Sequence, residues 1–101
     1  MHYKLVVPGP IDDVEEVRVL EWHCAPGKSF APGELIVEVE THKAVVEIRA
    51  AHSGVLRRVL CEEGGWRKIG GPLALMSDAA GEELPDTDEG LNALAVTFAV
   101  F

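Results

Sequence analysis

Two β-branched runs flank a polar break in Leu35-Ile36-Val37-Glu38-Val39-Glu40-Thr41-His42-Lys43-Ala44-Val45-Val46-Glu47-Ile48. On both sides of the break apolar residues alternate with acidic ones, which is the period of a β-strand with one buried face. The polar residues 41–44 between the runs are typical of a hairpin turn. The sequence therefore predicts two antiparallel strands whose turn lifts Lys43 away from the sheet.

The remainder of the first 76 residues shows the same strand pattern. Further short β-branched or alternating runs lie at 3–7, 13–22, 55–60 and 73–76. Gly and Pro separate these runs at the spacing of about 8–12 residues that is typical of all-β domains. No window sustains the 3.6-residue stripe of an amphipathic helix. We therefore expect an all-β fold, either an antiparallel sandwich or a barrel.

An internal repeat becomes visible when the residue numbers are shifted by 37. The shift aligns Val19 with Leu56, Trp22 with Val59, Cys24 with Cys61, Gly27 with Gly64, Gly33 with Gly70, and Ile36 with Leu73. Glycine at four equivalent turn positions suits backbone conformations with positive φ. The repeat predicts a duplicated domain in which each half covers the apolar face of the other with quasi-two-fold symmetry.

Composition excludes several classes of protein. A chain of 101 residues is enough for one domain, and its net charge of −8 disfavours nucleic acid as a partner. No apolar run approaches the length of about 20 residues that a membrane span needs, so we expect no membrane partner. Two cysteines without a secretory context indicate a cytoplasmic protein with reduced thiols. We expect Cys24 and Cys61 to be buried structural thiols.

The charge distribution divides the chain into three parts. All 9 Lys and Arg residues precede Ser77, so the folded domain is expected in residues 1–76. Residues 77–90 are small and acidic, which predicts an acidic linker. Residues 91–101 alternate large and small side chains, as expected for a docking strand with one bulky face. Such a strand is expected to pair with its own domain, with a second copy in a homo-oligomer, or with a partner protein; a helical docking segment is the alternative.

The surroundings of Lys43 resemble a known family. Leu5-Val6-Val7-Pro8 opens the resemblance, and Glu40-Thr41-His42-Lys43-Ala44 follows Gly33 at the family spacing. Glu47, Ala50 and Gly54 then follow the lysine at their usual distances. Over most of the first 76 residues the sequence resembles the lipoyl domain of 2-oxo acid dehydrogenase complexes, part of the biotinyl/lipoyl attachment family.

The resemblance implies a flattened antiparallel barrel-sandwich of two four-stranded sheets. It implies lipoate attached covalently to Lys43, which would make the chain a swinging-arm carrier of acyl groups and electrons without its own catalytic site. In such a carrier the protein supplies position and recognition, and the cofactor supplies the chemistry. The residues implied in recognition around the lipoyl site are Glu40, Thr41, His42, Ala44 and Glu47.

The resemblance also implies partners. These are a thiamin-dependent 2-oxo acid decarboxylase, a dihydrolipoyl acyltransferase, dihydrolipoyl dehydrogenase, and a lipoate ligase or lipoyl transferase. The chain lacks the His-x-x-x-Asp-Gly signature of a dihydrolipoyl acyltransferase domain, although it could be part of such a component. We therefore do not expect it to turn over substrate on its own.

Two departures from the family pattern carry expectations of their own. His42 stands where the family has Asp, so it is either a changed recognition contact or a tolerated exposed turn residue. Trp66 stands close to the family's usual Val, and we expect it to fill that space while Arg67 points outward. His23, His42 and His52 match no zinc-ligand spacing, so we expect no metal site.

Two other functions stay open at this stage. A biotin carrier shares the fold, but biotin carriers usually flank the lysine with methionines, and here the neighbours are His42 and Ala44. The second alternative is an unmodified lipoyl-like barrel that serves as a protein-interaction or assembly module. An intact lysine motif favours the carrier over this module, whereas a single-module chain without a catalytic domain keeps the module open.

Overall fold

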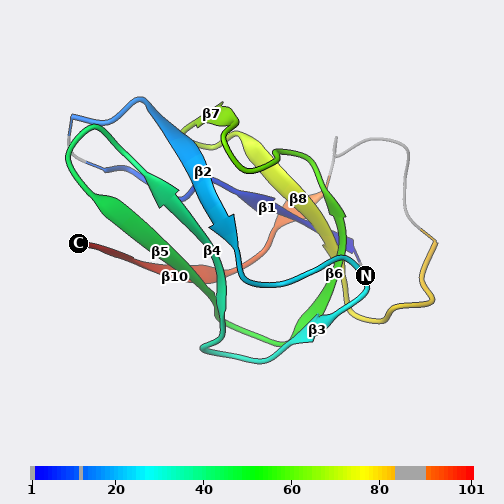
Figure 1. The fold of residues 1–101 in the computed structure, drawn as a ribbon. Helices are drawn as coiled ribbons and strands as arrows, with labels where there is room; N and C mark the ends of the chain where they lie inside the picture. The colour runs from blue at the N-terminus through cyan, green and yellow to red at the C-terminus, as the bar shows by residue number, and fades with distance from the viewer. Residues whose placement is uncertain (1, 12, 84–90) are drawn as a thin grey trace.

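The computed structural model describes residues 2–11, 13–83 and 91–101 as two β-sheets packed face to face (Figure 1). In these residues there is no helix, and so none that could span a membrane. The strands are β1 (His2–Val6), β2 (Glu16–Trp22), β3 (Ser29–Phe30), β4 (Leu35–Glu40), β5 (Val45–Ala50), β6 (Gly54–Val59), β7 (Trp66–Lys68), β8 (Pro72–Ser77), β9 (Asn92–Ala93) and β10 (Val96–Val100).

Each sheet has five strands. One sheet has the order β3-β6-β8-β1-β9 and the other has the order β10-β5-β4-β2-β7. All neighbours pair antiparallel except β1 and β9, which are parallel. The predicted all-β antiparallel sandwich is therefore confirmed. The predicted four-stranded sheets are both present, but each gains one edge strand from the C-terminal segment.

The backbone repeats itself at the offset found in the sequence. Gly27 N donates a hydrogen bond to Leu56 O at 2.7 Å, and Gly64 N donates the equivalent bond to Val19 O at 2.8 Å. The paired bonds link the two halves reciprocally, as a quasi-two-fold axis requires. All four repeat glycines have φ between 83° and 90°, a conformation that side chains with a Cβ rarely adopt. This explains why the turns on both sides of the duplication use glycine.

A single apolar core lies between the sheets. Its large members come from inward-facing strand positions in both halves, and each loses nearly all contact with water. Burying one such side chain contributes about 1.5–3 kcal/mol to folding. The fully buried large residues include Leu5, Ile36, Ile48, Leu56, Leu73 and Met76.

Residues 91–101 form strands on both sheets of their own chain. Leu94, which lies between β9 and β10 in the chain, is buried. Its backbone N donates a hydrogen bond to Lys4 O at 2.8 Å. β10 then runs antiparallel to β5, from the pair Val96–Ala50 to the pair Val100–Val46. The segment is therefore extended rather than helical, and it crosses from the edge of one sheet to the edge of the other.

The predicted acidic linker is only partly described. Ser77, its first residue, is the last residue of β8 and is buried. Its hydroxyl accepts a hydrogen bond from the Arg57 guanidinium at 3.0 Å and donates to Ala79 O at 2.7 Å. Residues 84–90 of the predicted linker lie outside the described residues.

The prediction for Trp66 and Arg67 is wrong, because the two side chains point in the opposite directions. In β7, Trp66 pairs with Arg18 on the outer face and is 53% exposed. Arg67 instead pairs with the buried Val17. The half-buried Arg67 guanidinium donates to the carbonyl oxygens of Leu60 at 2.7 Å and Pro72 at 3.1 Å. A third bond runs to Trp66 O at 2.9 Å, so the acceptors of the guanidinium among the described residues are backbone carbonyls.

The two cysteines are free thiols in different surroundings. Cys61 is buried in the core, as predicted. Cys24, its equivalent in the first half, is only half-buried and packs against the edge of the core. The two cysteines therefore occupy equivalent positions in the two halves but are buried to different extents.

Candidate functional site

The turn between β4 and β5 is held by one side chain. The strands pair as far as Glu40 and Val45, which leaves residues 41–44 as the tip. Thr41 N donates to Ala44 O at 2.8 Å, which closes the turn. Thr41 Oγ1 accepts from the backbone N of Lys43 at 3.1 Å and from the backbone N of Ala44 at 3.0 Å. Because the hydroxyl binds two consecutive amides, it fixes the backbone from which the Lys43 side chain projects.

Lys43 is accessible and weakly held. Its side chain is 58% exposed, and Nζ lies 3.2 Å from Oδ2 of Asp13, which is exposed. Exposed ion pairs of this kind contribute about 0–1 kcal/mol. Asp13 has φ 60°, in the left-handed region that Asp tolerates better than most residues. The Lys43 amine is thus available to another protein at little cost.

The predicted recognition residues all lie on this hairpin. Thr41 and Ala44 are half-buried in the turn, and His42 is exposed. Glu40 and Glu47 sit on the strands on the outer face of the sheet, where each carboxylate has a cationic neighbour. Glu40 binds the Arg18 guanidinium at 2.9 Å, and Glu47 binds the Arg49 guanidinium at 3.2 Å. The two glutamates therefore shape the base of the hairpin rather than its tip.

The sequence did not indicate three residues that lie near the lysine hairpin. These are Asp13, Arg18 and Trp66. An acidic groove of about 630 Å³ beside the hairpin is lined by His42, Trp66, Asp13, Val14, Glu15 and Glu16. The pattern of residues 13–16 resembled the start of a strand, whereas β2 begins only at Glu16. The acidic residues of that loop thus become available at the side of the lysine hairpin.

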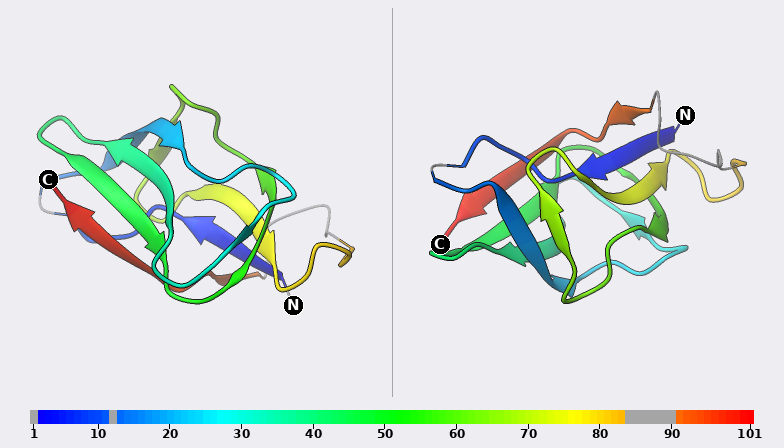
Figure 2. Two further views of the ribbon diagram at one scale, coloured as in Figure 1. Left: turned by 60° about the horizontal axis from the view of Figure 1, so that its bottom comes forward. Right: turned by 90° about the horizontal axis from the view of Figure 1, so that it is seen from above.

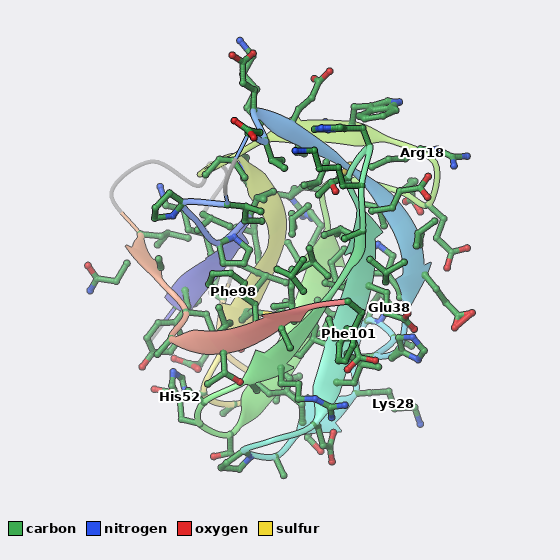
Figure 3. All side chains as sticks on the ribbon, turned by 90° about the vertical axis from the view of Figure 1, so that its left-hand side faces the viewer. Arg18, Lys28, Glu38, His52, Phe98 and Phe101 are labelled. Atoms are coloured by element: carbon green, nitrogen blue, oxygen red, sulfur yellow. The ribbon has the colours of Figure 1, made fainter. Side chains whose placement is uncertain are left out.

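The histidines raised as possible metal ligands have separate surroundings. His23 Nε2 lies 2.5 Å from Glu38 Oε1 and 3.3 Å from Glu21 Oε2, the one cluster of metal-ligand types among residues 2–11, 13–83 and 91–101. His52 instead packs against the ring of Tyr3, with the ring centroids 5.3 Å apart. Figure 3 shows His52 well apart from Glu38. The three histidines therefore do not form one site.

Comparison with known proteins finds a family match that includes the lysine hairpin. The model of the biotin/lipoyl family, described as "Biotin-requiring enzyme", matches residues 4–76. The dihydrolipoyllysine-residue succinyltransferase component of 2-oxoglutarate dehydrogenase complex from Bacillus subtilis is 34% identical over 79 residues, which are 78% of this chain and 19% of that protein. The corresponding Escherichia coli K12 protein is 38% identical over 60 residues, which are 59% of this chain and 15% of its own.

A relative of a second kind matches almost the whole chain. The dihydrolipoyllysine-residue acetyltransferase component of pyruvate dehydrogenase complex from Rickettsia bellii is 30% identical over 89 residues, 88% of this chain and 21% of its own. The chain thus spans about a fifth of the length of these relatives. Since the family match covers both halves of the duplication and the lysine hairpin, the chain belongs to the biotinyl/lipoyl attachment family, as a domain of the lipoyl type found in acyltransferase components of 2-oxo acid dehydrogenase complexes.

Proposed function

We propose that the chain is a lipoyl carrier whose lipoate is joined to Lys43. The observation that carries the proposal is the position of Lys43, an exposed lysine at the tip of a hairpin fixed by Thr41, within the matched region. The names of the relatives support lipoate over biotin, because they are dihydrolipoyllysine-residue acyltransferases. A ligase must reach the amine and also recognise a rigid frame around it, and this hairpin offers both.

The residues at the tip suit formation of an amide. The neutral Nζ of Lys43 would attack the carboxyl carbon of an activated lipoyl donor, whose leaving group departs with its bonding electrons while Nζ gives up a proton. Asp13 is the one carboxylate that binds Nζ among the described residues, and it is too exposed to hold the amine back. Once attached, lipoate supplies a dithiolane that accepts acyl groups and electrons. The hairpin then serves only to present and orient the arm.

The partners follow from the carrier role. We propose that the arm visits a thiamin-dependent 2-oxo acid decarboxylase, a dihydrolipoyl acyltransferase and dihydrolipoyl dehydrogenase, after loading by a lipoate ligase or lipoyl transferase in the cytoplasm. Tethering raises the concentration of the dithiolane at each active site into the millimolar range of short linkers. His42 and the acidic groove beside it offer these enzymes a recognition surface next to the lysine.

Intact mass spectrometry after incubation with a lipoate ligase, ATP and lipoate tests the proposal. We expect the mass to increase by one lipoyl group in the wild-type chain and in Lys28→Arg. We expect no increase in Lys43→Arg. Lys28 is the matched control because it is also exposed and also lies outside the strands, at the end of a turn closed by its backbone bond to Ala25 O at 3.0 Å. Both substitutions keep the positive charge, so only the identity of the acceptor changes.

Other results separate the alternatives. An increase by one biotin group in the presence of a biotin ligase, and none with lipoate, would identify a biotin carrier. Absence of either modification in a chain whose circular dichroism shows the folded sheets would favour the unmodified interaction module. In that case His42→Asp, which restores the family residue, tests whether the histidine blocks the ligase.

A further inference from the structure

A second, apolar groove opens beside Lys43 and shares Val14 with the acidic groove. It has a volume of about 350 Å³ and lies between β10 and the loop after β1. Figure 2 shows the C-terminal end of β10 next to the β4–β5 hairpin in both views. The groove volume is at the lower end of the range of about 300–1,000 Å³ for small-molecule sites. Its lining includes Ile11, Val14, Lys43, Ala44, Phe98 and Val100.

The strand register explains why this groove is apolar. Phe98 pairs with Ile48 and Val100 pairs with Val46, and both partners are fully buried on the inner face of the sheet. Directly paired residues of antiparallel strands point to the same face. Phe98 and Val100 therefore continue the inner face, and Figure 3 shows Phe98 and Phe101 on opposite sides of β10.

Among the described residues, the inner face of β10 is only partly covered at its C-terminal half. The strand of the opposite sheet that could face it, β9, has only two residues. As a result Phe98 is 39% exposed and Val100 is 50% exposed, although their partners on β5 are buried. Both side chains line the same groove, and a contiguous apolar surface of this kind is typical of a binding site.

The occupant that fits this surface is the arm of Lys43 itself. The lysine lines the groove, so an arm attached to Nζ begins at its rim. Lipoate is a short aliphatic chain that ends in a cyclic disulfide, and it matches apolar walls without buried polar groups. Acylation also removes the charge that binds Nζ to Asp13, which lines the acidic groove instead. Because the arm is tethered, even weak contacts are favoured by the effective concentration of about millimolar that short linkers give.

We propose that Phe98 and Val100 of β10 form a resting site for the lipoyl arm on Lys43. The proposal rests on the proposed function, since it needs lipoate on this lysine. It adds that the C-terminal strand, which lies beyond the matched residues 4–76, shields the dithiolane between visits to partner enzymes.

The test uses the full chain, first shown by intact mass to be fully lipoylated. We expect through-space NMR contacts between the dithiolane protons and the side chains of Phe98 and Val100, unchanged on dilution. Lys43→Gln, which is neutral but has no arm, provides the reference for chemical shifts that come from loss of charge alone. After reduction, the dithiol should also be alkylated more slowly than free dihydrolipoamide.

Variants of β10 make the assignment specific. Phe98→Ser should abolish the contacts and speed alkylation of the dithiol, whereas Ala99→Ser, on the outer face of the same strand, should change neither. Slow exchange of the Phe101 amide, which donates to Val45 O at 2.8 Å, checks that β10 stays paired. If Phe98→Ser releases the strand, Val100→Thr keeps the side-chain shape and replaces a methyl by a hydroxyl, and it should weaken the same contacts.

The outcomes distinguish the two proposals. A chain that takes up no lipoate at Lys43 overturns the proposed function. A chain that is lipoylated, but has the chemical shifts of Lys43→Gln and no contacts to β10, overturns the resting site and leaves the carrier role intact. Contacts that disappear on dilution also overturn it, because they would come from a second copy.

Discussion

The turn after β4 and the turn after β8 occupy equivalent places in the duplicated sandwich, yet only the first carries a lysine. At the offset of 37, Thr41 corresponds to Asp78 and Lys43 corresponds to Ala80. β4 continues directly into its neighbour β5, so its turn is a tight hairpin. The equivalent neighbour of β8 is β1, which comes from the other end of the sequence, so these two strands are not joined by a hairpin. A duplicated frame thus provides one rigid tip rather than two.

The C-terminal strands extend this difference. β9 and β10 add to equivalent strands, β1 and β5, at the edges of the two sheets. β9 pairs over only two residues in parallel, whereas β10 pairs over five in antiparallel fashion. The longer strand ends beside the lysine hairpin. The frame is therefore symmetric where it supports folding and asymmetric where it carries the functional group.

Substitutions in the core should have the largest effect and should treat the two halves alike. Ile36→Ala and Leu73→Ala truncate equivalent, fully buried side chains. Each should lower the free energy of unfolding by about 2–5 kcal/mol, the cost of a lost side chain plus the cavity it leaves. Urea denaturation followed by circular dichroism measures this loss. If one of the two variants retained nearly wild-type stability, the halves would not share one core.

The turn glycines provide a smaller test of the same symmetry. Gly33 and Gly70 have φ of 87° and 83°, and a Cβ at either would meet no atom within 4 Å. Gly33→Ala and Gly70→Ala should therefore cost about 1–2 kcal/mol each from backbone conformation alone. Thermal unfolding of the two variants side by side should give similar decreases in Tm. A loss confined to one variant would contradict the equivalence of the turns.

Removal of the Thr41 hydroxyl should affect the lysine hairpin more than the stability of the domain. Thr41→Val leaves the backbone amides of Lys43 and Ala44 without their acceptor, and should cost about 0.5–1.5 kcal/mol. Because the turn then loses its fixed shape, lipoylation of Lys43 should slow more than stability falls. Thr41→Ser keeps the oxygen and should restore the rate. Equal rates of lipoylation in Thr41→Val and wild type would show that the ligase does not need the fixed turn.

The features that could be predicted from the sequence are those set by nearby residues or by the internal repeat. The hairpin around Lys43 follows from alternation within a few residues, and the glycine turns follow from one offset. The positions of Trp66 and Arg67 could not be predicted, because β7 has three residues and its register is set by pairing with β2. The approach of Asp13 to Lys43, 30 residues later, depends on how a loop folds over the end of the sandwich. Likewise, nothing local in residues 96–100 shows which strand they join.

The smallest expected effect is a difference in the alkylation rates of the two cysteines. Cys24 and Cys61 occupy equivalent positions but differ in burial. Partial burial raises the pKa of the Cys24 thiol, and the Glu34 carboxylate raises it further, while a backbone hydrogen bond with Ala25 opposes them. A raised pKa leaves less thiolate at a given pH, so at pH 8 an alkylating reagent should modify Cys24 more slowly than free cysteine. The buried Cys61 should react only when the domain unfolds.

Glu34→Gln tests the electrostatic part of this difference. Without the carboxylate the pKa of Cys24 falls, so the rate of alkylation at pH 8 should rise slightly in the variant while that of Cys61 stays unchanged. Mass spectrometry of the alkylated peptides gives both rates in one sample. If Cys61 reacted as fast as Cys24 in the native chain, the second half of the sandwich would open more readily than the first, and the symmetric core would have to be less cooperative than its packing indicates.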